Sequence, residues 1–262
     1  MLKNRVLDLE PRMTFDHHPN LPSSFRMLII GSSGSGKTCL LLQMLLEPGF
    51  MDYNNLIIFT PTKSQQEYQL LYHGFSSGLS KESVASILLN QEKFKGASIA
   101  ELCKTLYETQ QRNNPNHSRS TITCSLTDKT DDLIPPYKLD KTKKHLIIFD
   151  DCITLDNQKT LSSYFIKGRH NSCNSIYLTQ SYFDLDRMIR LNVNILILFK
   201  LNARNKTDIF NSVVGNIMDR KEFDALASHV WSKKYRYIVI NRNSEKIIND
   251  IFEEEDDDSD SD

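Results

Sequence analysis

The segment Arg26-Met-Leu-Ile-Ile-Gly-Ser-Ser-Gly-Ser-Gly-Lys-Thr38 decides the fold of this 262-residue chain. It joins a short apolar run, residues 26–30, to a cluster of glycine and serine, and a helix-like apolar stretch at 38–46 follows until Pro48-Gly49 ends it. A short apolar run is typical of a buried strand, whereas glycine and proline punctuate turns. The sequence therefore predicts a strand, a tight loop and a helix in direct succession.

The loop between this strand and this helix has the spacing G-x-x-x-x-G-K-[ST], which is typical of loops that bind phosphate groups. Glycines let the backbone turn its N–H groups toward phosphate oxygens, and the start of the helix adds the positive end of its dipole. Lys37 is expected to bridge the β and γ phosphates of a nucleotide, and Thr38 to coordinate Mg²⁺. The candidate nucleotide-binding residues are Gly31, Ser32, Ser33, Gly34, Ser35, Gly36, Lys37 and Thr38.

A second apolar run, His145-Leu-Ile-Ile-Phe149, ends in Asp150-Asp151. A carboxylate at the carboxyl end of a neighbouring strand can reach the Mg²⁺ shell of a bound nucleotide, so Asp150 is the predicted metal-side acid. Asp151 is then expected to orient or activate the attacking water. The structural alternative makes Asp151 the N-cap of a helix near Asn157, or a plain loop acid.

Two polar residues beside the next apolar run, residues 175–178, complete the candidate catalytic set. Gln180 follows that run and could sense a γ-phosphate or a water by hydrogen bonding, although a glutamine at a strand end is ordinarily only exposed. Arg169 precedes the run, and a guanidinium is suited to stabilising charge on a transferring phosphoryl group. On the residues alone, a surface salt bridge is the favoured role for Arg169.

The rest of the chain alternates between apolar runs and helical patterning. Further strands are predicted at 55–60 and 195–199, and the runs are almost continuously apolar, which suits a parallel sheet covered on both faces. This alternation predicts an α/β fold with a doubly wound sheet. Residues 235–240 and 246–248 are expected to form a hairpin at one edge of that sheet. The other expected helices cover 63–72, 157–165, 184–191 and 205–214, with weaker helical patterning at 81–107.

The chain divides into three predicted parts. Residues 25–252 form one domain, after an N-terminal extension at 1–24 and before an acidic tail at 253–262. Within the domain, residues 110–132 are rich in Asn, Ser, Thr and Asp, which predicts a long exposed insertion or a disordered loop. The tail carries eight acidic groups and no basic one, so self-repulsion predicts that it is disordered.

Composition sets broad limits on the class of protein. The chain is 39% hydrophobic and 25% charged, as globular proteins are, and no apolar run approaches the length of a membrane helix. The N-terminus shows no secretory signal and the five cysteines include no Cys-x-x-Cys pair, which predicts an intracellular protein with reduced thiols. Without the tail, 32 basic and 25 acidic groups leave a net charge of +7, which is compatible with a nucleic-acid partner.

The phosphate loop, the Asp150-Asp151 strand end, Gly168-Arg-His170 and Ser175-Ile-Tyr-Leu-Thr-Gln-Ser-Tyr182 together resemble the genome-packaging ATPases of the FtsK–HerA superfamily. Within it, the poxvirus-type enzymes of large DNA viruses, virophages and Maverick/Polinton elements are the most similar, over about residues 25–201. The resemblance implies an additional-strand P-loop NTPase fold and a homo-oligomeric ring. It also implies ATP hydrolysis with Mg²⁺, coupled to moving double-stranded DNA into a preformed viral capsid.

The resemblance also implies partners and residue roles. Capsid or assembly proteins would be partners, at virus assembly sites in the host cytoplasm or nucleus. Asp150 matches the metal aspartate, and Asp151 matches the catalytic acid, a position where many members carry glutamate. Gln180 matches the polar sensor, and Arg169 matches the arginine finger that is offered to the ATP of the neighbouring subunit.

Other P-loop functions stay open at this point. Asn205-Lys206-Thr207-Asp208 spells the N-K-x-D motif of guanine recognition, which would make the chain a GTPase-like switch. Guanine recognition expects that motif directly at a strand end, whereas here it follows the strand at 195–199 by several residues, so a helix start is favoured. A nucleotide kinase would need a lid and an acceptor-recognition segment. A nucleotide-gated assembly factor that binds ATP without turnover is a third alternative.

Overall fold

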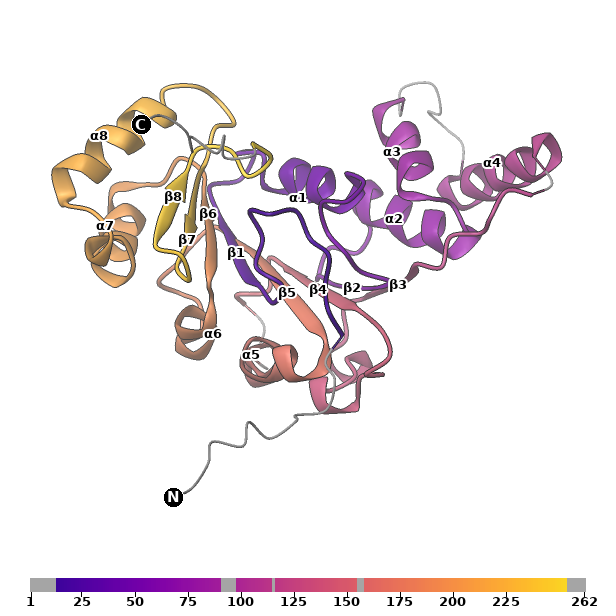
Figure 1. Cartoon of the computed structure of the whole chain (residues 1–262), viewed down its shortest axis with the longest axis horizontal. Helices are drawn as coiled ribbons and strands as arrows, with labels where there is room; N and C mark the ends of the chain where they lie inside the picture. The colour runs from indigo at the N-terminus through magenta and orange to yellow at the C-terminus, as the bar shows by residue number, and fades with distance from the viewer. Residues whose placement is uncertain (1–12, 91–97, 115, 155–157, 254–262) are drawn as a thin grey trace, which may run out of the picture.

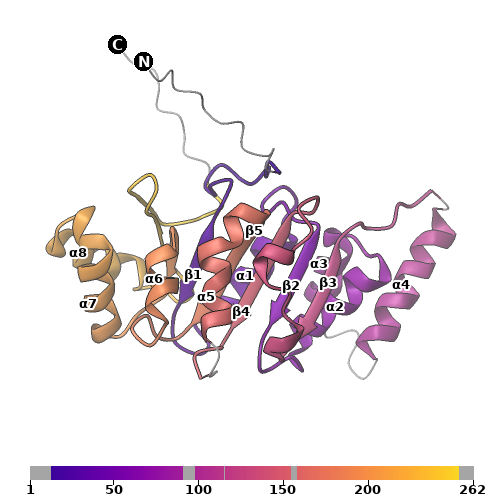
Figure 2. The same ribbon diagram turned by 90° about the horizontal axis from the view of Figure 1, so that it is seen from below.

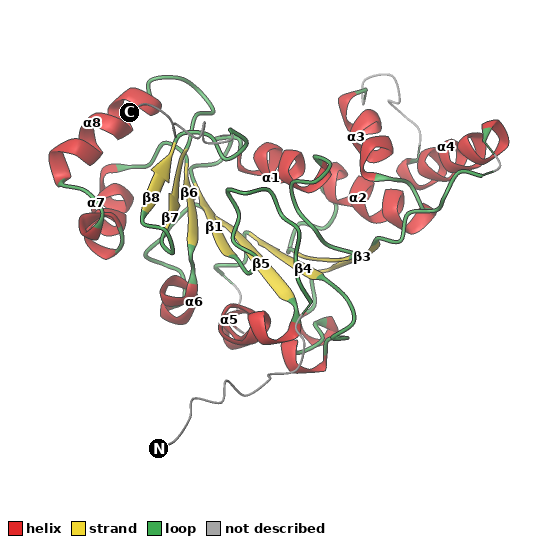
Figure 3. Cartoon of the chain, viewed as in Figure 1, coloured by secondary structure: helices red, strands yellow, loops and turns green. Residues whose placement is uncertain are grey.

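The computed structural model describes residues 13–90, 98–114, 116–154 and 158–253, and its centre is an eight-stranded sheet with helices on both sides (Figures 1 and 3). The strands are β1 (Arg26–Ile30), β2 (Asn55–Phe59), β3 (Thr123–Thr127), β4 (His145–Asp150), β5 (Cys173–Thr179), β6 (Ile195–Leu198), β7 (Ile238–Asn241) and β8 (Lys246–Ile248). The helices are α1 (Lys37–Leu46), α2 (Gln66–Ser77), α3 (Lys81–Leu89), α4 (Ile99–Asn113), α5 (Gln158–Lys167), α6 (Arg187–Asn192), α7 (Ala203–Ser212) and α8 (Arg220–Val230). None of these helices is long and apolar enough to cross a bilayer.

The strand order across the sheet is β3-β2-β4-β5-β1-β6-β7-β8. The first six strands pair in parallel, and β7 and β8 continue the sheet as an antiparallel hairpin beside β6. β5 lies between β1, which leads into the phosphate loop, and β4, which ends in Asp150. The predicted mainly parallel sheet with an additional strand and a C-terminal hairpin is therefore confirmed, and its topology brings the carboxyl ends of β1, β4 and β5 to one edge.

Helices cover both faces of the sheet. Alternate residues of β1 point to opposite sides, with Met27 and Ile29 in one core cluster and Leu28 and Ile30 in the other. The first cluster is completed by α1–α4, and the second by α5–α8. Seen from below, α5 and α6 lie over the face of the sheet opposite α1 (Figure 2). The continuous apolar character of the strands follows from this double burial.

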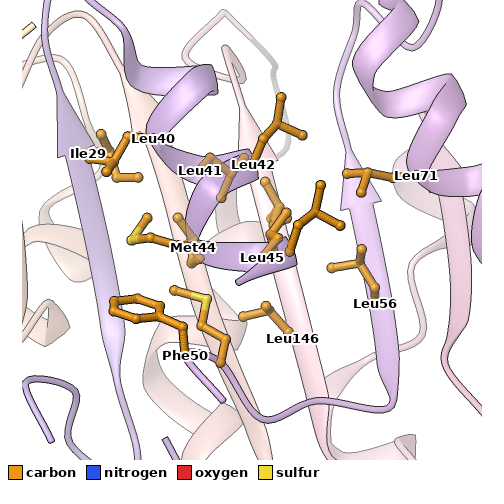
Figure 4. Close-up of a cluster of buried hydrophobic side chains, with 14 of the residues drawn as sticks. Ile29, Leu40, Leu41, Leu42, Met44, Leu45, Phe50, Leu56, Leu71 and Leu146 are labelled. Carbon is orange, nitrogen blue, oxygen red and sulfur yellow. The ribbon is translucent and has the colours of Figure 1, made fainter. Parts of the chain in front are cut away.

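Helix α1 is anchored to the sheet by its apolar face. Leu41, Met44 and Leu45 are fully buried, and they lie among Ile29 of β1 and Leu146 of β4 in the cluster of Figure 4. Each such side chain contributes about 1.5–3 kcal/mol when it is removed from water. The packing fixes the direction of α1, so its first turn is held at the carboxyl edge of the sheet.

The insertion predicted at 110–132 is partly wrong. Helix α4 extends into it as far as Asn113, and β3 pairs in parallel with β2 at the edge of the sheet. Ile122, Cys124 and Leu126 pack against the core cluster, whereas Thr123 and Ser125 are exposed. An edge strand buries only one face, so its apolar content is low and the polar composition of the segment concealed it.

The C-terminal part differs from prediction in two places. Strand β7 begins at Ile238 rather than at Tyr235, because Tyr235 has a φ of 64°, which is left-handed backbone and not strand. Helix α8 was not predicted at all. Its start carries a capping box, in which Asp219 accepts from the amide of Glu222 and Glu222 accepts from that of Asp219. This D-x-x-E pattern is the signal in the sequence that could have found the helix.

The described part of the N-terminal extension, residues 13–24, lies against the domain. Leu21 is buried in the first core cluster. The Nδ1 atom of His17 accepts the amide N–H of Asp52 at 2.9 Å, and its Nε2 atom lies 2.9 Å from the side-chain nitrogen of Asn174. The extension is thus bound to the domain through both polar and apolar contacts. Residues 1–12, and the acidic tail beyond Glu253, lie outside the described residues.

Stability should fall on acidification through His17. Burial, the largest effect, lowers the pKa of His17 from 6.5 to about 4, with Asp52 and Asp16 opposing the shift and Lys144 and Lys81 adding to it. The unfolded state therefore binds more protons between pH 6.5 and 4, so stability that is present above pH 6.5 is lost as the pH falls through that window. Between pH 6.5 and 4, we expect the unfolding free energy of the wild type to fall by about 2 kcal/mol more than that of His17→Gln. This figure is lower than the pKa shift alone would give, because His17 is partly exposed to solvent.

Denaturant unfolding at pH 8, 6.5, 5 and 4 measures this difference. The offset between the two proteins at pH 8 serves as the baseline, because His17 is neutral there in both states. An offset that stays constant down to pH 4 would contradict the assignment.

Candidate functional site

The phosphate loop, residues 31–36, joins β1 to α1 at the carboxyl edge of the sheet. Gly36 has a φ of 105°, in the left-handed region that favours glycine. A Cβ at Gly31 would lie 2.6 Å from Oγ of Ser35 and 2.7 Å from Cβ of Phe199, so no side chain fits there. Gly36 is therefore required by its backbone conformation, and Gly31 by the close approach of Ser35 and Phe199.

The first turn of α1 is left open to an anion. Its N-cap, Gly36, offers no side-chain hydrogen bond, and the first turn carries no acidic residue. Helices α7 and α8, in contrast, are capped by Asn202 and Asp219. The N–H groups at a helix start and the positive end of the dipole bind phosphate well. The hydroxyl of Ser35 is buried without a hydrogen-bond partner among the described residues, but Ser35 does not line the cavity described below.

Lys37 is the first residue of α1, and its side chain contacts the loop. Its Nζ atom donates to the carbonyl oxygens of Gly31 at 2.7 Å and of Ser32 at 2.9 Å. Burial lowers the pKa of Lys37 from its ordinary value, and the carboxylates of Asp150 and Asp151 oppose that shift. The structure thus brings the ammonium into the field of both acids that were predicted to share its site.

Asp150 ends β4 as a buried carboxylate, only 7% exposed. The hydroxyl of Tyr68, from α2, donates to its Oδ2 atom at 2.7 Å. Burial raises the pKa of Asp150, and the Tyr68 hydrogen bond and Lys37 oppose this, whereas Asp151 adds to it. Burial also raises the pKa of Tyr68, so its hydroxyl stays protonated as the donor. Tyr68 therefore holds one carboxylate oxygen of Asp150.

Sequence reasoning missed Tyr68, although its spacing to Leu71 and Phe75 shows that one face of α2 is buried. Replacing it with phenylalanine should raise the Mg²⁺ concentration needed for half-maximal turnover by about 5- to 150-fold. The reason is that the buried Oδ2 of Asp150 then loses its donor, which costs about 1–3 kcal/mol. A titration of hydrolysis with Mg²⁺ at saturating nucleotide measures the change.

Tyr53→Phe is the matched control for that experiment. Tyr53 is also buried and donates its hydroxyl to the carbonyl of Leu45 at 2.9 Å, but it lies outside the site. An equal shift of the Mg²⁺ dependence in both variants would contradict a specific role of Tyr68.

Asp151 and Gln180 lie beside Asp150 on neighbouring strand ends. Asp151 is exposed, has a φ of 53°, and its amide donates to the carbonyl of Leu178 at 3.3 Å. Left-handed backbone at a residue other than glycine is strained and clusters at functional sites. Gln180 is exposed, and its carbonyl accepts from the side chain of Asn205 at 3.1 Å. The residue needed for the alternative N-cap role of Asp151, Asn157, lies outside the described residues.

These side chains line one cavity of about 320 Å³. Its wall brings Asp150, Asp151 and Gln180 together with five of the eight predicted nucleotide-binding residues, whereas Gly31, Ser32 and Ser35 do not line it. It also includes four residues that were not predicted for the site, namely Cys39, Gln65, Leu178 and Thr179. The lining residues are Ser33, Gly34, Gly36, Lys37, Thr38, Cys39, Gln65, Asp150, Asp151, Leu178, Thr179 and Gln180.

Arg169 is not brought into this cavity. It lies in a short 3-10 turn, Gly168–Asn171, just before β5, whereas Gln180 follows the other end of that strand. A strand of this length spans about 20 Å, so Arg169 lies at the amino-terminal ends of the parallel strands, opposite the carboxyl ends that carry the cavity. It is exposed there. The pKa of Arg26 is lowered mainly by burial and, as the next largest cause, by the positive charge of Arg169. Within one chain, Arg169 cannot reach the phosphate loop.

The donors at the cavity fit Mg²⁺. The ion prefers oxygen ligands, and it is commonly bound by one or two protein oxygens together with nucleotide phosphates and water. Thr38 offers a hydroxyl and Asp150 a carboxylate on the same cavity wall. Thr38 and Asp150 would therefore hold the metal between the loop and β4.

The fold and the phosphate loop define the chain as a P-loop NTPase. Residues 12–76, which contain the loop, α1 and β2, match the family described as Poxvirus A32 protein. This match confirms the resemblance to the poxvirus-type ATPases.

Solved structures are similar to this chain at low sequence identity. The DNA-packaging ATPase B204 of Sulfolobus Turreted Icosahedral Virus is 13% identical, with a TM-score of 0.51, covering 86% of this chain and 95% of its own. B204 of Sulfolobus turreted icosahedral virus 2 in complex with AMP is 12% identical, with a TM-score of 0.49, covering 87% and 98%. VirB4 of Thermoanaerobacter pseudethanolicus is 10% identical, with a TM-score of 0.49, covering 86% and 88%. No curated protein matches the chain by sequence.

Proposed function

We propose that the chain is an ATPase that drives double-stranded DNA into a preformed viral capsid. The observation that carries the proposal is that Lys37 and Thr38 line one cavity with Asp150 and Asp151 beside the uncapped start of α1. Support for the packaging role comes from the Poxvirus A32 match and from the fold shared with a DNA-packaging ATPase. The protein would act with capsid or assembly proteins at virus assembly sites in the host cell.

The polar groups of the predicted site have distinct proposed parts in hydrolysis. The loop amides and Lys37 hold the phosphates, and Lys37 exchanges its contacts with Gly31 and Ser32 for phosphate oxygens. Mg²⁺ supplies positive charge to the β and γ phosphates when it is bound. The exposed carboxylate of Asp151 accepts a proton from the attacking water, and Gln180 holds that water by a hydrogen bond.

Arg169 is proposed to act on a neighbouring copy. Its position at the edge opposite the cavity excludes it from its own site, but head-to-tail contacts in a ring place one edge of a subunit against another edge of the next. An exposed guanidinium at that edge is available to a second copy of the chain. The proposed assembly is therefore a homo-oligomeric ring in which each site is completed by Arg169 of the adjacent subunit.

The residues of the N-K-x-D motif do not favour the GTPase alternative. They lie within α7, where Asn205 accepts the amide of Tyr182 and donates to Gln180, and Lys206 pairs with Asp224 at 2.9 Å. A guanine base needs the asparagine and aspartate side chains to be available at a loop. We therefore propose ATP as the nucleotide.

The test is the rate of ATP and GTP hydrolysis with and without double-stranded DNA, together with the mass of the assembled particle. We expect DNA to stimulate ATP hydrolysis, and the particle mass to be a multiple of 30.3 kDa. A preference for GTP would overturn the motor in favour of a switch. Stable ATP binding without turnover, even with DNA, would indicate a nucleotide-gated assembly factor instead.

A further inference from the structure

The loop between α8 and β7 places an aromatic ring against the phosphate loop. A Cβ at Gly36 would lie 3.3 Å from Cδ1 of Tyr235 and 3.4 Å from Cε1 of Phe199. Tyr235 is nevertheless 66% exposed, so the ring touches the loop with one part and leaves most of its surface to solvent. Such a large exposed ring gains little from burial, so packing alone does not account for its position.

The backbone holds Tyr235 in this place. Its φ of 64° is left-handed, which is uncommon for a residue other than glycine and persists only where the surroundings impose it. The loop is fastened at both ends, because the indole nitrogen of Trp231 donates to the carbonyl of Leu198 at 3.1 Å and the hydroxyl of Tyr237 donates to Asp250 at 2.9 Å. The ring of Tyr237 also packs on Phe199. The position of Tyr235 is thus set before any ligand binds.

The topology tells which part of a nucleotide faces Tyr235. The γ-phosphate must lie toward Asp150, Asp151 and Gln180, which end β4 and β5 on one side of β1. β6 and β7 lie on the other side of β1, and the loop that carries Tyr235 leads into β7 (Figure 1). A nucleotide gripped by the phosphate loop therefore extends its base away from the acids and toward Tyr235.

We infer that Tyr235 stacks on the purine base of the bound nucleotide. Purines stack well on aromatic side chains, at about 1–3 kcal/mol per base by alanine substitution, which corresponds to about 5- to 150-fold in affinity. The inference rests on the proposed function, since it requires that the phosphate loop binds a nucleoside triphosphate.

Binding of two ligands to the full chain tests the inference, with ATP as one and inorganic tripolyphosphate, which lacks the base, as the other. Tyr235→Ala should raise the Kd for ATP about tenfold and leave the Kd for tripolyphosphate within about twofold, because only ATP has a base to stack. Tyr235→Phe should keep the affinity for ATP, since the ring remains. Tyr137→Ala, which removes an equally exposed ring far along the chain, is the matched control and should change neither Kd.

The outcomes separate this inference from the proposed function. An unchanged ratio of the two Kd values in Tyr235→Ala would overturn the stacking, whether both affinities fall together or neither changes. Loss of ATP affinity in Tyr235→Phe as well would also overturn it, because the hydroxyl would then be the group that matters. Binding of neither ligand by the wild type would overturn the nucleotide site itself, and the stacking with it.

Discussion

Lys37→Ala should strongly weaken nucleotide binding or abolish turnover. The side chain is the cation of the phosphate loop, held by the carbonyls of Gly31 and Ser32 on the wall of the cavity. Its charge-assisted bonds to phosphate oxygens are about twice as strong as neutral ones, and its loss leaves several phosphate charges without their principal partner. We expect at least about a hundredfold rise in Kd for ATP, because two such bonds are each worth about 1.5–3 kcal/mol. Calorimetric titration and phosphate release measure the two effects.

Lys63→Ala is the matched control for this change. Lys63 is an exposed lysine on the loop before α2, where it pairs with Asp128 at 2.9 Å and lies outside the cavity. Its removal should leave ATP affinity and basal turnover near those of the wild type. Hydrolysis at the wild-type rate in Lys37→Ala would show that the phosphate loop is not the nucleotide site, and it would overturn the proposed ATPase.

Arg169→Ala should lower turnover by about 10³-fold or more while the affinity for ATP stays nearly unchanged. An arginine that stabilises charge in phosphoryl transfer is worth roughly 10³ to 10⁵ in rate, and it acts on the transition state rather than on the bound ground state. Arg169 lies at the ends of the strands opposite the phosphate loop, so it can only act on the site of a neighbouring subunit. Steady-state kinetics with a separate binding measurement distinguish turnover from affinity.

Mixing two inactive proteins tests the transfer between subunits. Asp151→Asn subunits keep Arg169, and Arg169→Ala subunits keep Asp151, so a mixed ring contains some sites with both groups intact. We expect partial recovery of hydrolysis on mixing, whereas each protein alone stays inactive. Lys167→Ala, which removes another exposed charge at the same edge, should keep basal turnover and serves as the control. Recovery that never exceeds the sum of the two separate proteins would argue against the finger.

Much of the nucleotide site could be predicted because its signals are local. The strand, loop and helix around Lys37 are contiguous in the chain, and Gly36 is demanded by the left-handed backbone at that position. Asp150 was found because an acid after a continuously apolar run stands out as a strand end. The hairpin at β7 and β8 was also predicted, although the strand begins three residues later than expected.

The amino-acid sequence alone thus established the phosphate loop, the acid pair and the α/β class, since these depend on short-range patterns of apolar, glycine and acidic residues. Only the tertiary structure decided the bond from Tyr68 to Asp150, the pairing of β3 at the sheet edge, and the place of Arg169 far from its own cavity. The physical reason is that a side chain's partner across the fold depends on strand order and helix packing. Those bring distant segments together and leave no mark at the residues themselves.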